Sequence, residues 1–397
     1  MGSIERGLHV RPLLPRKGST IVSDRVGAAV LGLGVGRMHA QAYHQLETAD
    51  LVAVCDAQQE RLDPIAEQYG CRAYTSLDDL LADKNVQLIS VATPHKSHAA
   101  LAIRCMEAGK HVIVEKPLTV DLAEADAMLA ASKATGMTLG TVFQRRYWPA
   151  AMKVKGAIDA GKIGAPVLGI AQVSFPRSQK YYERDAWRGS WEHEGGGVLT
   201  NQGIHTIDMF QWFMGGDPVE VSGRWANLTH PYIDVEDTAA AVIRFGSGAL
   251  GVLSGTTSAS WSHMSIVIHG SQGHSVGVME EPEGAIGYNH VWNIPGEVGT
   301  VEQSLAEHVE RGEYMFRTDN SPHGLGGTWT TAYQFKAPGE PNYHARQIAD
   351  LVESIRQGRR PLVDGYEGKK SVAILQAVYE SSRTGLPVKL EGLSPDA

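Results

Sequence analysis

The fold is decided by the stretch Ala28-Ala29-Val30-Leu31-Gly32-Leu33-Gly34-Val35-Gly36-Arg37-Met38-His39-Ala40, which has the pattern of a strand, a glycine turn and a helix start. Glycines permit a tight turn and let backbone amides approach a pyrophosphate, which then rests on the positive end of the helix. The spacing is Gly-x-Gly-x-Gly, one residue short of the usual fingerprint, so either Gly36 shifts or Arg37 fills the third place. The motif predicts a dinucleotide site; a purely structural glycine turn is the alternative interpretation.

An acidic residue downstream indicates which dinucleotide binds. Asp56 ends the next apolar run, about twenty residues after the turn, where an acid binds the ribose hydroxyls. Its carboxylate would repel a 2′-phosphate and no Lys or Arg flanks it directly, so NAD is favoured over NADP. A helix-capping aspartate is the alternative. The residues predicted here to bind the cofactor are Gly32, Gly34, Val35, Gly36, Arg37, Met38 and Asp56.

Around this turn, short apolar runs alternate with helical stretches, which predicts right-handed βαβ units. The fold class is therefore α/β, and residues 24–145 are predicted to form a Rossmann domain, a doubly wound parallel sheet. The predicted strands are Val26–Leu31, Leu51–Cys55, Leu88–Ala92, His111–Val114 and Thr138–Phe143. The predicted helices are Gly36–Leu46, Gln58–Tyr69, Leu77–Ala82, Ser97–Ala108 and Leu122–Thr135.

The pattern changes after Pro149, and residues 146–397 are predicted to form a C-terminal α/β domain. Strand patterns dominate its first half, which indicates a largely antiparallel open sheet. They lie at Val167–Phe175, Val219–Leu228, Thr238–Phe245, Gly248–Thr257 and Met264–His269, followed by long loops within 280–340 and helices at 344–357 and 367–384. Residues 1–23 have no apolar core like that of a signal peptide and are predicted to be a mobile or subunit-contacting arm.

Composition narrows the class of protein. The 397 residues suffice for two domains, and 43% hydrophobic with 20% charged residues is ordinary for a globular protein. A net charge of -8 without a Lys/Arg block argues against a nucleic-acid partner, and no apolar run is long enough to span a membrane. Cys55, Cys71 and Cys105 show neither paired nor metal-type spacing, so we predict no metal site and a cytoplasmic location.

The strongest candidate for chemistry is Lys116, in the run Val112-Ile113-Val114-Glu115-Lys116-Pro117. An apolar strand that ends in Glu-Lys-Pro places an ammonium group at the carboxyl edge of the parallel sheet, where such sheets bind ligands. Burial and a nearby pyridinium would lower the pKa of this lysine from about 10.4 toward neutrality, which makes it a candidate proton acceptor. A structural salt bridge with Glu115 is the alternative.

The preceding predicted strand leads into Thr93-Pro94-His95-Lys96-Ser97-His98. Thr93 and Pro94 are predicted to line the cofactor, and His98 to begin a helix that points toward it. A capping or packing histidine is the alternative for His98.

Residues 195–210 carry a partner motif, in which three glycines precede a helical stretch. Such glycines let backbone come close to a ligand. Asn201, His205 and Asp208 then share one helical face, at spacings i, i+4 and i+7. We interpret this polar stripe as facing the substrate, with His205 exchanging a hydrogen bond with a hydroxyl and Asp208 orienting its ring. A buried structural network is the alternative.

The chain resembles the Gfo/Idh/MocA family of glucose–fructose oxidoreductase, inositol dehydrogenase and rhizopine-catabolism proteins, over about residues 26–275 and 344–390. The resemblance rests on Gly32-Leu33-Gly34, Asp56, Thr93-Pro94 with His98, Glu115-Lys116-Pro117, Gln144-Arg145-Arg146-Tyr147, Trp187-Arg188 and Gly195–His205. It implies NAD(P), a sugar or polyol substrate, and a homodimer or homotetramer formed through the C-terminal sheet. It also implies cofactor contacts by Glu115, Lys116, Gln144, Trp187 and Arg188, and substrate contacts by Lys116, Arg146, Tyr147, Asn201, His205 and His95.

One position departs from the family pattern. Many members carry Asp four residues before the His, whereas this chain has Asn201. An amide cannot stabilise an imidazolium by charge, so we predict Lys116 as the proton acceptor, His205 as relay or hydrogen-bond donor, and Asn201 as a hydroxyl anchor. Asn here also resembles the branch that oxidises C3 of pyranosides. The hypothesis is an NAD-dependent dehydrogenase acting on a pyranose sugar, sugar acid, glycoside or polyol.

Two other functions stay open at this stage. The family includes NAD-dependent glycosidases that transiently oxidise C3, eliminate the aglycone, add water and reduce again. Tyr147, His95 or Tyr181 would provide the extra acid or base. A non-catalytic NAD or sugar sensor would keep the fold, but the retention of Lys116 together with His205 argues against it.

Two sets of side chains are candidates for substrate recognition at the rim of the cleft. Arginines there would bind a carboxylate, phosphate or sulfonate, with solvated surface arginines as the alternative. They are Arg145, Arg146, Arg177, Arg184 and Arg188. Tryptophans would stack on a pyranose face, with hydrophobic packing as the alternative. They are Trp187, Trp191, Trp292 and Trp329.

Overall fold

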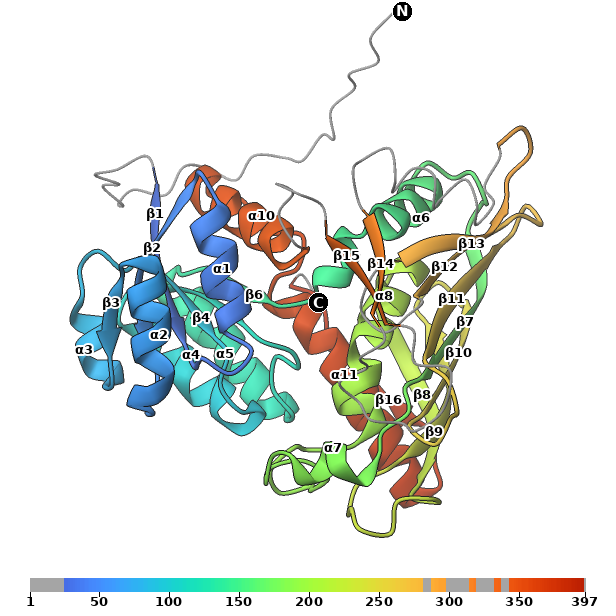
Figure 1. The fold of residues 1–397 in the computed structure, drawn as a ribbon. Coiled ribbons are helices and arrows are strands. Elements are labelled where there is room, and N and C mark those ends of the chain that lie inside the picture. Colours follow the sequence, from blue (N-terminus) through green and yellow to red (C-terminus); the bar gives the residue numbers. More distant parts are fainter. Residues whose placement is uncertain (1–24, 281–286, 298–313, 319–331, 337–342, 396–397) are drawn as a thin grey trace, which may run out of the picture.

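The first half of the chain folds around a parallel sheet of six strands, in the order β3-β2-β1-β4-β5-β6 (Figure 1). The computed structural model describes residues 25–280, 287–297, 314–318, 332–336 and 343–395. The strands are β1 (Val26–Leu31), β2 (Ala49–Cys55), β3 (Arg72–Tyr74), β4 (Leu88–Val91), β5 (His111–Val114) and β6 (Leu139–Thr141). The sequence predicted all of them except β3, whose three residues include no buried one and form no apolar run.

Helices cover both faces of this sheet. The two layers are α1 (Arg37–Gln45), α2 (Gln59–Tyr69) and α10 (Tyr343–Gln357) on one side, and α3 (Leu77–Ala82), α4 (His98–Glu107) and α5 (Leu122–Thr135) on the other. Alternate residues of β1 supply the two cores, because successive side chains of a strand point to opposite faces. Ala28 and Val30 pack in the first core, and Ala29 and Leu31 in the second.

The helix α10 completes the first of these cores from the far end of the chain. Ile348 and Leu351 of α10 pack with the residues of β1 and α1. The side chain of Gln347 donates to the carbonyl of Thr141 (2.6 Å) and accepts from the amide of Phe143 (2.9 Å). The end of β6 is thereby fixed against α10, so the core of the Rossmann domain uses residues outside 24–145.

The second half is built on an eight-stranded sheet in the order β13-β12-β11-β7-β10-β9-β8-β16. Its strands are β7 (Pro166–Ser174), β8 (Pro218–Ala226), β9 (Thr238–Phe245), β10 (Leu250–Thr256), β11 (His263–Gly270), β12 (Ser275–Glu280), β13 (Gly287–Asn293) and β16 (Val388–Lys389). All neighbouring pairs are antiparallel except β7 with β10, so the predicted largely antiparallel sheet is confirmed. A separate antiparallel pair is formed by β14 (Tyr314–Thr318) and β15 (Ala332–Lys336).

One face of this sheet is covered by helices, as Figure 1 shows. The further helices of this half are α6 (Pro149–Asp159), α7 (Gln179–Glu183), α8 (Ile204–Met214) and α11 (Gly365–Thr384), and a π-helix (Leu199–Gly203) leads directly into α8. Phe210 of α8 packs against Gly251 of the sheet so closely that a Cβ there would lie 2.7 Å from its ring. Among the described helices, none is both long and apolar enough to cross a membrane.

The predicted loops within 280–340 are wrong for part of that segment, because β13, β14 and β15 lie there. Gly287 and Asn289 weaken the strand pattern locally, but both have distant partners. A Cβ on Gly287 would lie 2.3 Å from the Trp148 ring, and the side chain of Asn289 donates to the carbonyls of Ala150 (3.1 Å) and Gly277 (3.2 Å). The predicted arm 1–23 and Trp329 lie outside the described residues.

Candidate active site

The glycine turn after β1 is a tight structure that leaves one side open. Gly32 has φ +90°, and a Cβ on it would lie 2.7 Å from the carbonyl oxygen of Ala92. A Cβ on Gly36 would lie 2.0 Å from the carbonyl oxygen of Gly32. Only glycine fits these two positions. A Cβ on Gly34 would instead meet open space, so the turn presents bare backbone there.

The surface beside this turn fits a dinucleotide. Val35 and Met38 are 42% and 40% exposed, although both are apolar, and Arg37 between them opens α1. Amides at a helix N-terminus attract phosphate. Asp56 closes the turn from β2, because its carboxylate accepts hydrogen bonds from the amides of Leu33 (2.7 Å) and Gln58 (3.0 Å). The structure also brings a cation that spacing did not reveal: Arg61 Nη1 lies 3.9 Å from Asp56 Oδ2.

Glu115, predicted to contact the cofactor, is buried at the end of β5 with both oxygens engaged. Oε1 lies 2.9 Å from His39 Nε2, and Oε2 accepts from the amide of Lys116 (3.0 Å). Burial opposes ionisation of Glu115, but the hydrogen bond and charge of His39 outweigh it and lower its pKa to about 2. His344 of α10 joins this pair, with one ligand atom of each residue within 4.8 Å of the others. The residue before Lys116 in the chain is thus a buried carboxylate whose position is fixed by His39 and by the amide of Lys116.

His98 does not face the predicted cofactor site. Its ring is buried, and its nitrogens lie 2.9 Å from the carbonyl of Pro117 and 2.8 Å from the carbonyl of Thr93. The ring therefore ties the end of β4 to the end of β5. Its contribution is to hold Thr93 and Lys116 in register, which agrees with the packing alternative rather than with direct contact.

Lys116 and Asn201 meet although they come from different domains. The Nζ of Lys116 donates to the backbone carbonyl of Asn201 (3.1 Å) and to its side-chain Oδ1 (3.1 Å). Burial lowers the pKa of Lys116 to about 8; the charge of Glu115 opposes this effect, and Arg145 and Arg188 reinforce it. An amine with that pKa is partly neutral near pH 8 and can accept a proton there.

The predicted polar stripe of Asn201, His205 and Asp208 loses Asp208, which is bonded to Arg146. Asn201 lies in the π-helix, and such turns are frequent at functional sites. Asp208 points instead to Arg146, so it does not orient His205. The Nδ1 of His205 is buried without a hydrogen-bond partner among the described residues. Burial lowers the pKa of His205 well below 6.5, and the charges of Arg145 and Lys116 add to this, so the imidazole is neutral.

The triple glycine is required by packing inside the protein. A Cβ on Gly196 would lie 2.3 Å from the hydroxyl oxygen of Tyr379, and one on Gly197 would lie 1.9 Å from the carbonyl oxygen of Glu236. The buried carboxylate of Glu236 accepts from the amides of Gly197 (2.7 Å) and Leu199 (3.0 Å). These contacts fix the start of the π-helix and hence Asn201. The expectation that the glycines admit a ligand is replaced by this internal role.

The segment Gln144–Tyr147 is a 3-10 helix between the domains, and most of its side chains are engaged inside the protein. Arg146 is fully buried and donates to both oxygens of Asp208 (2.8 and 2.6 Å) and to Glu367 (2.7 Å). The hydroxyl of Tyr147 donates to Asp350 (2.9 Å). Arg146 and Tyr147 therefore do not lie free to bind substrate; they connect this helix to α8, α10 and α11. Gln144 remains partly exposed.

The side chain of Tyr181 lies beside Asn201 and contacts Arg188, which was predicted to bind the cofactor. Its hydroxyl oxygen accepts from Asn201 Nδ2 (3.1 Å) and from Arg188 Nη1 (2.6 Å). Arg188 also stacks on the ring of Trp187, 4.4 Å from its centroid, and that ring lies 5.2 Å from the ring of His95. This aromatic and cationic wall lies over the carboxyl end of β4. His95 itself is buried, with Nδ1 bonded to the carbonyl of Glu194 (2.9 Å).

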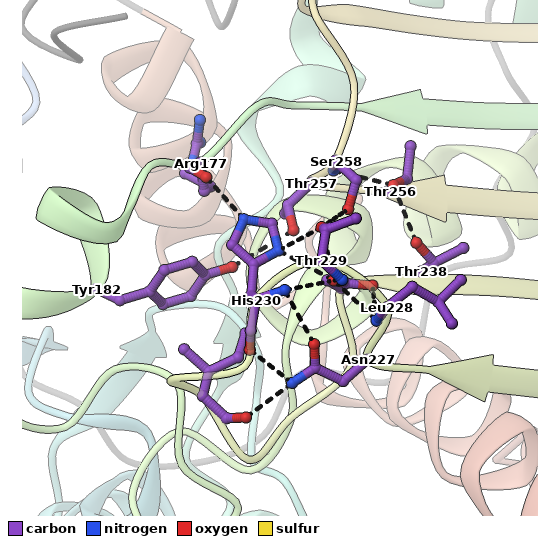
Figure 2. A network of polar contacts seen from close by, with 12 residues as sticks. Arg177, Tyr182, Asn227, Leu228, Thr229, His230, Thr238, Thr256, Thr257 and Ser258 are labelled. Atoms are coloured by element: carbon purple, nitrogen blue, oxygen red, sulfur yellow. Dashed lines mark hydrogen bonds and ion pairs between the residues drawn. The ribbon is translucent and has the colours of Figure 1, made fainter.

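A polar network joins Arg177 and Tyr182, from the chain segment that also carries Tyr181, to the second sheet (Figure 2). His230 lies at its centre, with Nε2 2.9 Å from the carbonyl of Arg177 and Nδ1 3.0 Å from Asp237 Oδ2. The ring of Tyr182 packs edge-on against His230, 5.6 Å between centroids. Arg177 and Tyr182 lie on either side of Tyr181 in the chain, so the network anchors the segment that carries it.

Comparisons with known proteins agree with this fold. Residues 26–143 match the model of the oxidoreductase family with an NAD-binding Rossmann fold, and residues 151–276 match the GFO/IDH/MocA C-terminal domain. The inositol 2-dehydrogenase of Rhizobium meliloti is 30% identical over 359 residues, which are 89% of this chain and 95% of that protein. The chain belongs to the Gfo/Idh/MocA family.

Other members resemble this Gfo/Idh/MocA protein over nearly their whole length. The myo-inositol 2-dehydrogenase of Thermotoga maritima is 28% identical over 374 residues, 92% of this chain and 98% of that protein. The WlbA dehydrogenase of Bordetella pertussis, solved with NADH and UDP-GlcNAcA, superposes with a TM-score of 0.75 at 27% identity, covering 92% of this chain and 99% of that one. The chain is therefore an NAD-dependent oxidoreductase that acts on CH–OH groups.

Within this Gfo/Idh/MocA protein, the sequence missed three groups around Lys116. Glu194 bonds to Asn201, and His39 and His344 surround Glu115. Signals existed for two of them: Glu194 directly precedes the triple glycine, and His39 lies inside the stretch that identified the turn. His344 is distant in sequence from every motif, so only the packing of α10 could reveal it.

Proposed function

We propose that this protein is an NAD-dependent dehydrogenase that oxidises a secondary hydroxyl, at C3, of a pyranose sugar or sugar derivative, with Lys116 as the proton acceptor and His205 as a hydrogen-bond partner of the substrate. The observation that carries the proposal is the pair of hydrogen bonds from Lys116 to the two oxygens of Asn201. The relatives support the substrate class, since they are inositol dehydrogenases and a WlbA dehydrogenase bound to UDP-GlcNAcA.

The arrangement of Lys116 explains how it takes a proton. The glycine turn and Asp56 would hold NAD, which would supply the hydride acceptor for the carbinol carbon. A neutral amine has two N–H donors, and Asn201 accepts both of them, one at its backbone carbonyl and one at Oδ1. The lone pair of the amine is left for the hydroxyl proton of the substrate. Neutral His205 binds a neighbouring hydroxyl and holds the sugar in place.

A substrate panel tests this function directly. The protein is incubated with NAD and with myo-inositol, UDP-GlcNAcA or aryl glycosides in turn, while NADH formation and phenol release are followed together. NADH formation without phenol is expected. Trapping the ketone with sodium borodeuteride and locating the deuterium by mass spectrometry should place it at C3. Phenol release without NADH would assign the redox-neutral glycosidase reaction instead, and a ketone at another carbon would reject the proposed position.

We also propose that the protein forms a homo-oligomer through the outer face of the second sheet. Val242, Val252 and Ile170 lie directly opposite one another on β9, β10 and β7, and are 48%, 39% and 42% exposed. A continuous row of branched apolar side chains on a solvent face marks an interaction surface. Val252→Glu with Val242→Glu should therefore lower the mass measured by light scattering to that of the monomer. Leu386→Glu, an exposed apolar residue beyond α11, should leave the mass unchanged. An unchanged mass in the double variant would exclude this face.

A cytoplasmic location is part of the same proposal. Cys55, Cys71 and Cys105 are all free thiols, and two of them are buried. Unpaired cysteines suit a reducing compartment.

A further inference from the structure

Glu194 is a buried carboxylate that is linked to Lys116 through the side chain of Asn201. It is 1% exposed. Its Oε2 accepts from the amide of Gly189 (2.6 Å), and its Oε1 accepts from the side-chain Nδ2 of Asn201 (2.5 Å). The backbone carbonyl of Glu194 lies 2.9 Å from Nδ1 of His95, within hydrogen-bond distance. Both carboxylate oxygens therefore face donors that are fixed in place.

This carboxylate decides which way the Asn201 amide points. An ionised carboxylate accepts hydrogen bonds and donates none, so the NH₂ group of Asn201 must face Glu194. The carbonyl Oδ1 is then directed to Lys116, which needs an acceptor. In the opposite orientation, two donors would face each other at Lys116 and two acceptors at Glu194. The hydroxyl of Tyr181 takes the second hydrogen of the same NH₂ group and supports this orientation.

The charge of Glu194 also reaches Lys116. Each group influences the other: Glu194 raises the pKa of Lys116 against the larger effect of burial, and Lys116 with Arg188 opposes the rise that burial causes in the pKa of Glu194. Asn201 carries no charge, and its side chain lies between these two groups. The negative charge that Asn201 lacks is therefore carried by Glu194, on the other side of the Asn201 amide from Lys116.

We propose that Glu194 is a positioning residue for the reaction proposed above: it holds the Asn201 amide with its carbonyl toward Lys116 and supplies the negative charge that Asn201 lacks. The inference rests on the proposed function, because it assigns a role in proton acceptance by Lys116. Glu194 acts through Asn201 and makes no contact with the reacting atoms.

The test measures the titration of Lys116 in the free protein. Trace acetic anhydride labels neutral amines, and mass spectrometry of the peptide containing Lys116 gives the extent of labelling at each pH. Glu194→Gln should lower the midpoint of this titration by roughly 0.5–1 pH unit, less than the one to three units of a direct ion pair. Glu192→Gln is the matched control, because it removes the same charge from an exposed position two residues earlier, and its midpoint should equal that of the wild type.

A charge-swap variant tests the role of the charge a second way, because it restores a carboxylate in the background of Glu194→Gln. Asn201→Asp combined with Glu194→Gln moves the carboxylate next to Lys116, and its midpoint should lie at or above the wild-type value. Circular dichroism checks the fold of each variant. A wild-type midpoint in Glu194→Gln, or a lowered one in the charge-swap variant, would overturn the role of Glu194. Neither substrate nor NAD enters the measurement, so this outcome is distinct from a failure of the proposed dehydrogenase activity.

Discussion

Lys116→Ala should lower kcat/KM for the oxidised sugar by about two to four orders of magnitude while the fold and NAD binding are retained. The amine of Lys116 is the group placed by both oxygens of Asn201 to accept the hydroxyl proton, and alanine leaves no replacement base there. His205 does not substitute for it, because its pKa is lowered well below 6.5 and it holds a proton poorly. The glycine turn and Asp56 are untouched by the change, so the affinity for NAD should stay close to that of the wild type.

The measurement combines initial rates, calorimetric titration with NAD and a thermal melt. Lys133→Ala is the matched control, since Lys133 is an exposed lysine in the last turn of α5, and its kcat/KM should equal that of the wild type. A Lys116→Ala enzyme with near-normal turnover would remove Lys116 from the mechanism. A loss of NAD affinity equal to the loss in rate would make Lys116 a cofactor ligand only.

The role of Lys116 as the base also predicts the direction in which kcat/KM changes with pH. Lys116 must be neutral to accept a proton, and burial lowers its pKa to about 8. For the wild type, kcat/KM should therefore rise with pH and level off above about 8. In Lys116→Ala this rise should disappear from the residual rate. A wild-type profile that is flat between pH 6 and 9 would contradict neutral Lys116 as the base.

The Rossmann half was predictable because its signals are local. The strand-turn-helix stretch around Gly32 fixes chain reversal within a few residues, and each buried parallel strand forms a continuous apolar run. The elements that escaped prediction owe their stability to distant partners. β13 is held by Trp148 and Ala150. The helix α10 was predicted, but its packing against the first core through Ile348 and Leu351 was not. No local pattern records such contacts.

Within the site, the sequence indicated which residues carry the chemistry, but it did not indicate which side chains each of them contacts. Lys116 and Asn201 were both named from the sequence, and the structure joins them. Their geometry could not be foreseen, because periodicity assumes an α-helix where a π-helix occurs at Asn201. Polar residues at helical spacing also do not reveal which buried charge they will meet, and Asp208 meets Arg146 rather than His205.

Arg146→Met should lower the free energy of unfolding by about 3–5 kcal/mol, the cost of leaving a buried charge without its partner. Arg146 and Asp208 are both fully buried and joined by two hydrogen bonds. Asp208→Leu should cost less than Arg146→Met, because Arg146 keeps its bond to Glu367 (2.7 Å). The double variant should recover part of the loss, since it leaves no carboxylate unpaired at this point. Urea titration followed by tryptophan fluorescence suits the measurement, as Trp212 stacks on the Arg146 guanidinium, 5.0 Å away.

The matched control is Arg383→Ala, which removes an arginine from an exposed ion pair with Glu380 and should leave the urea midpoint unchanged. This comparison decides between two roles for Arg146. A structural ion pair predicts lower stability in Arg146→Met and a KM near the wild-type value in the fraction that stays folded. A substrate ligand, as the sequence pattern suggested, predicts wild-type stability and a raised KM. The guanidinium is fully buried and held between two carboxylates inside the protein, so the first result is expected.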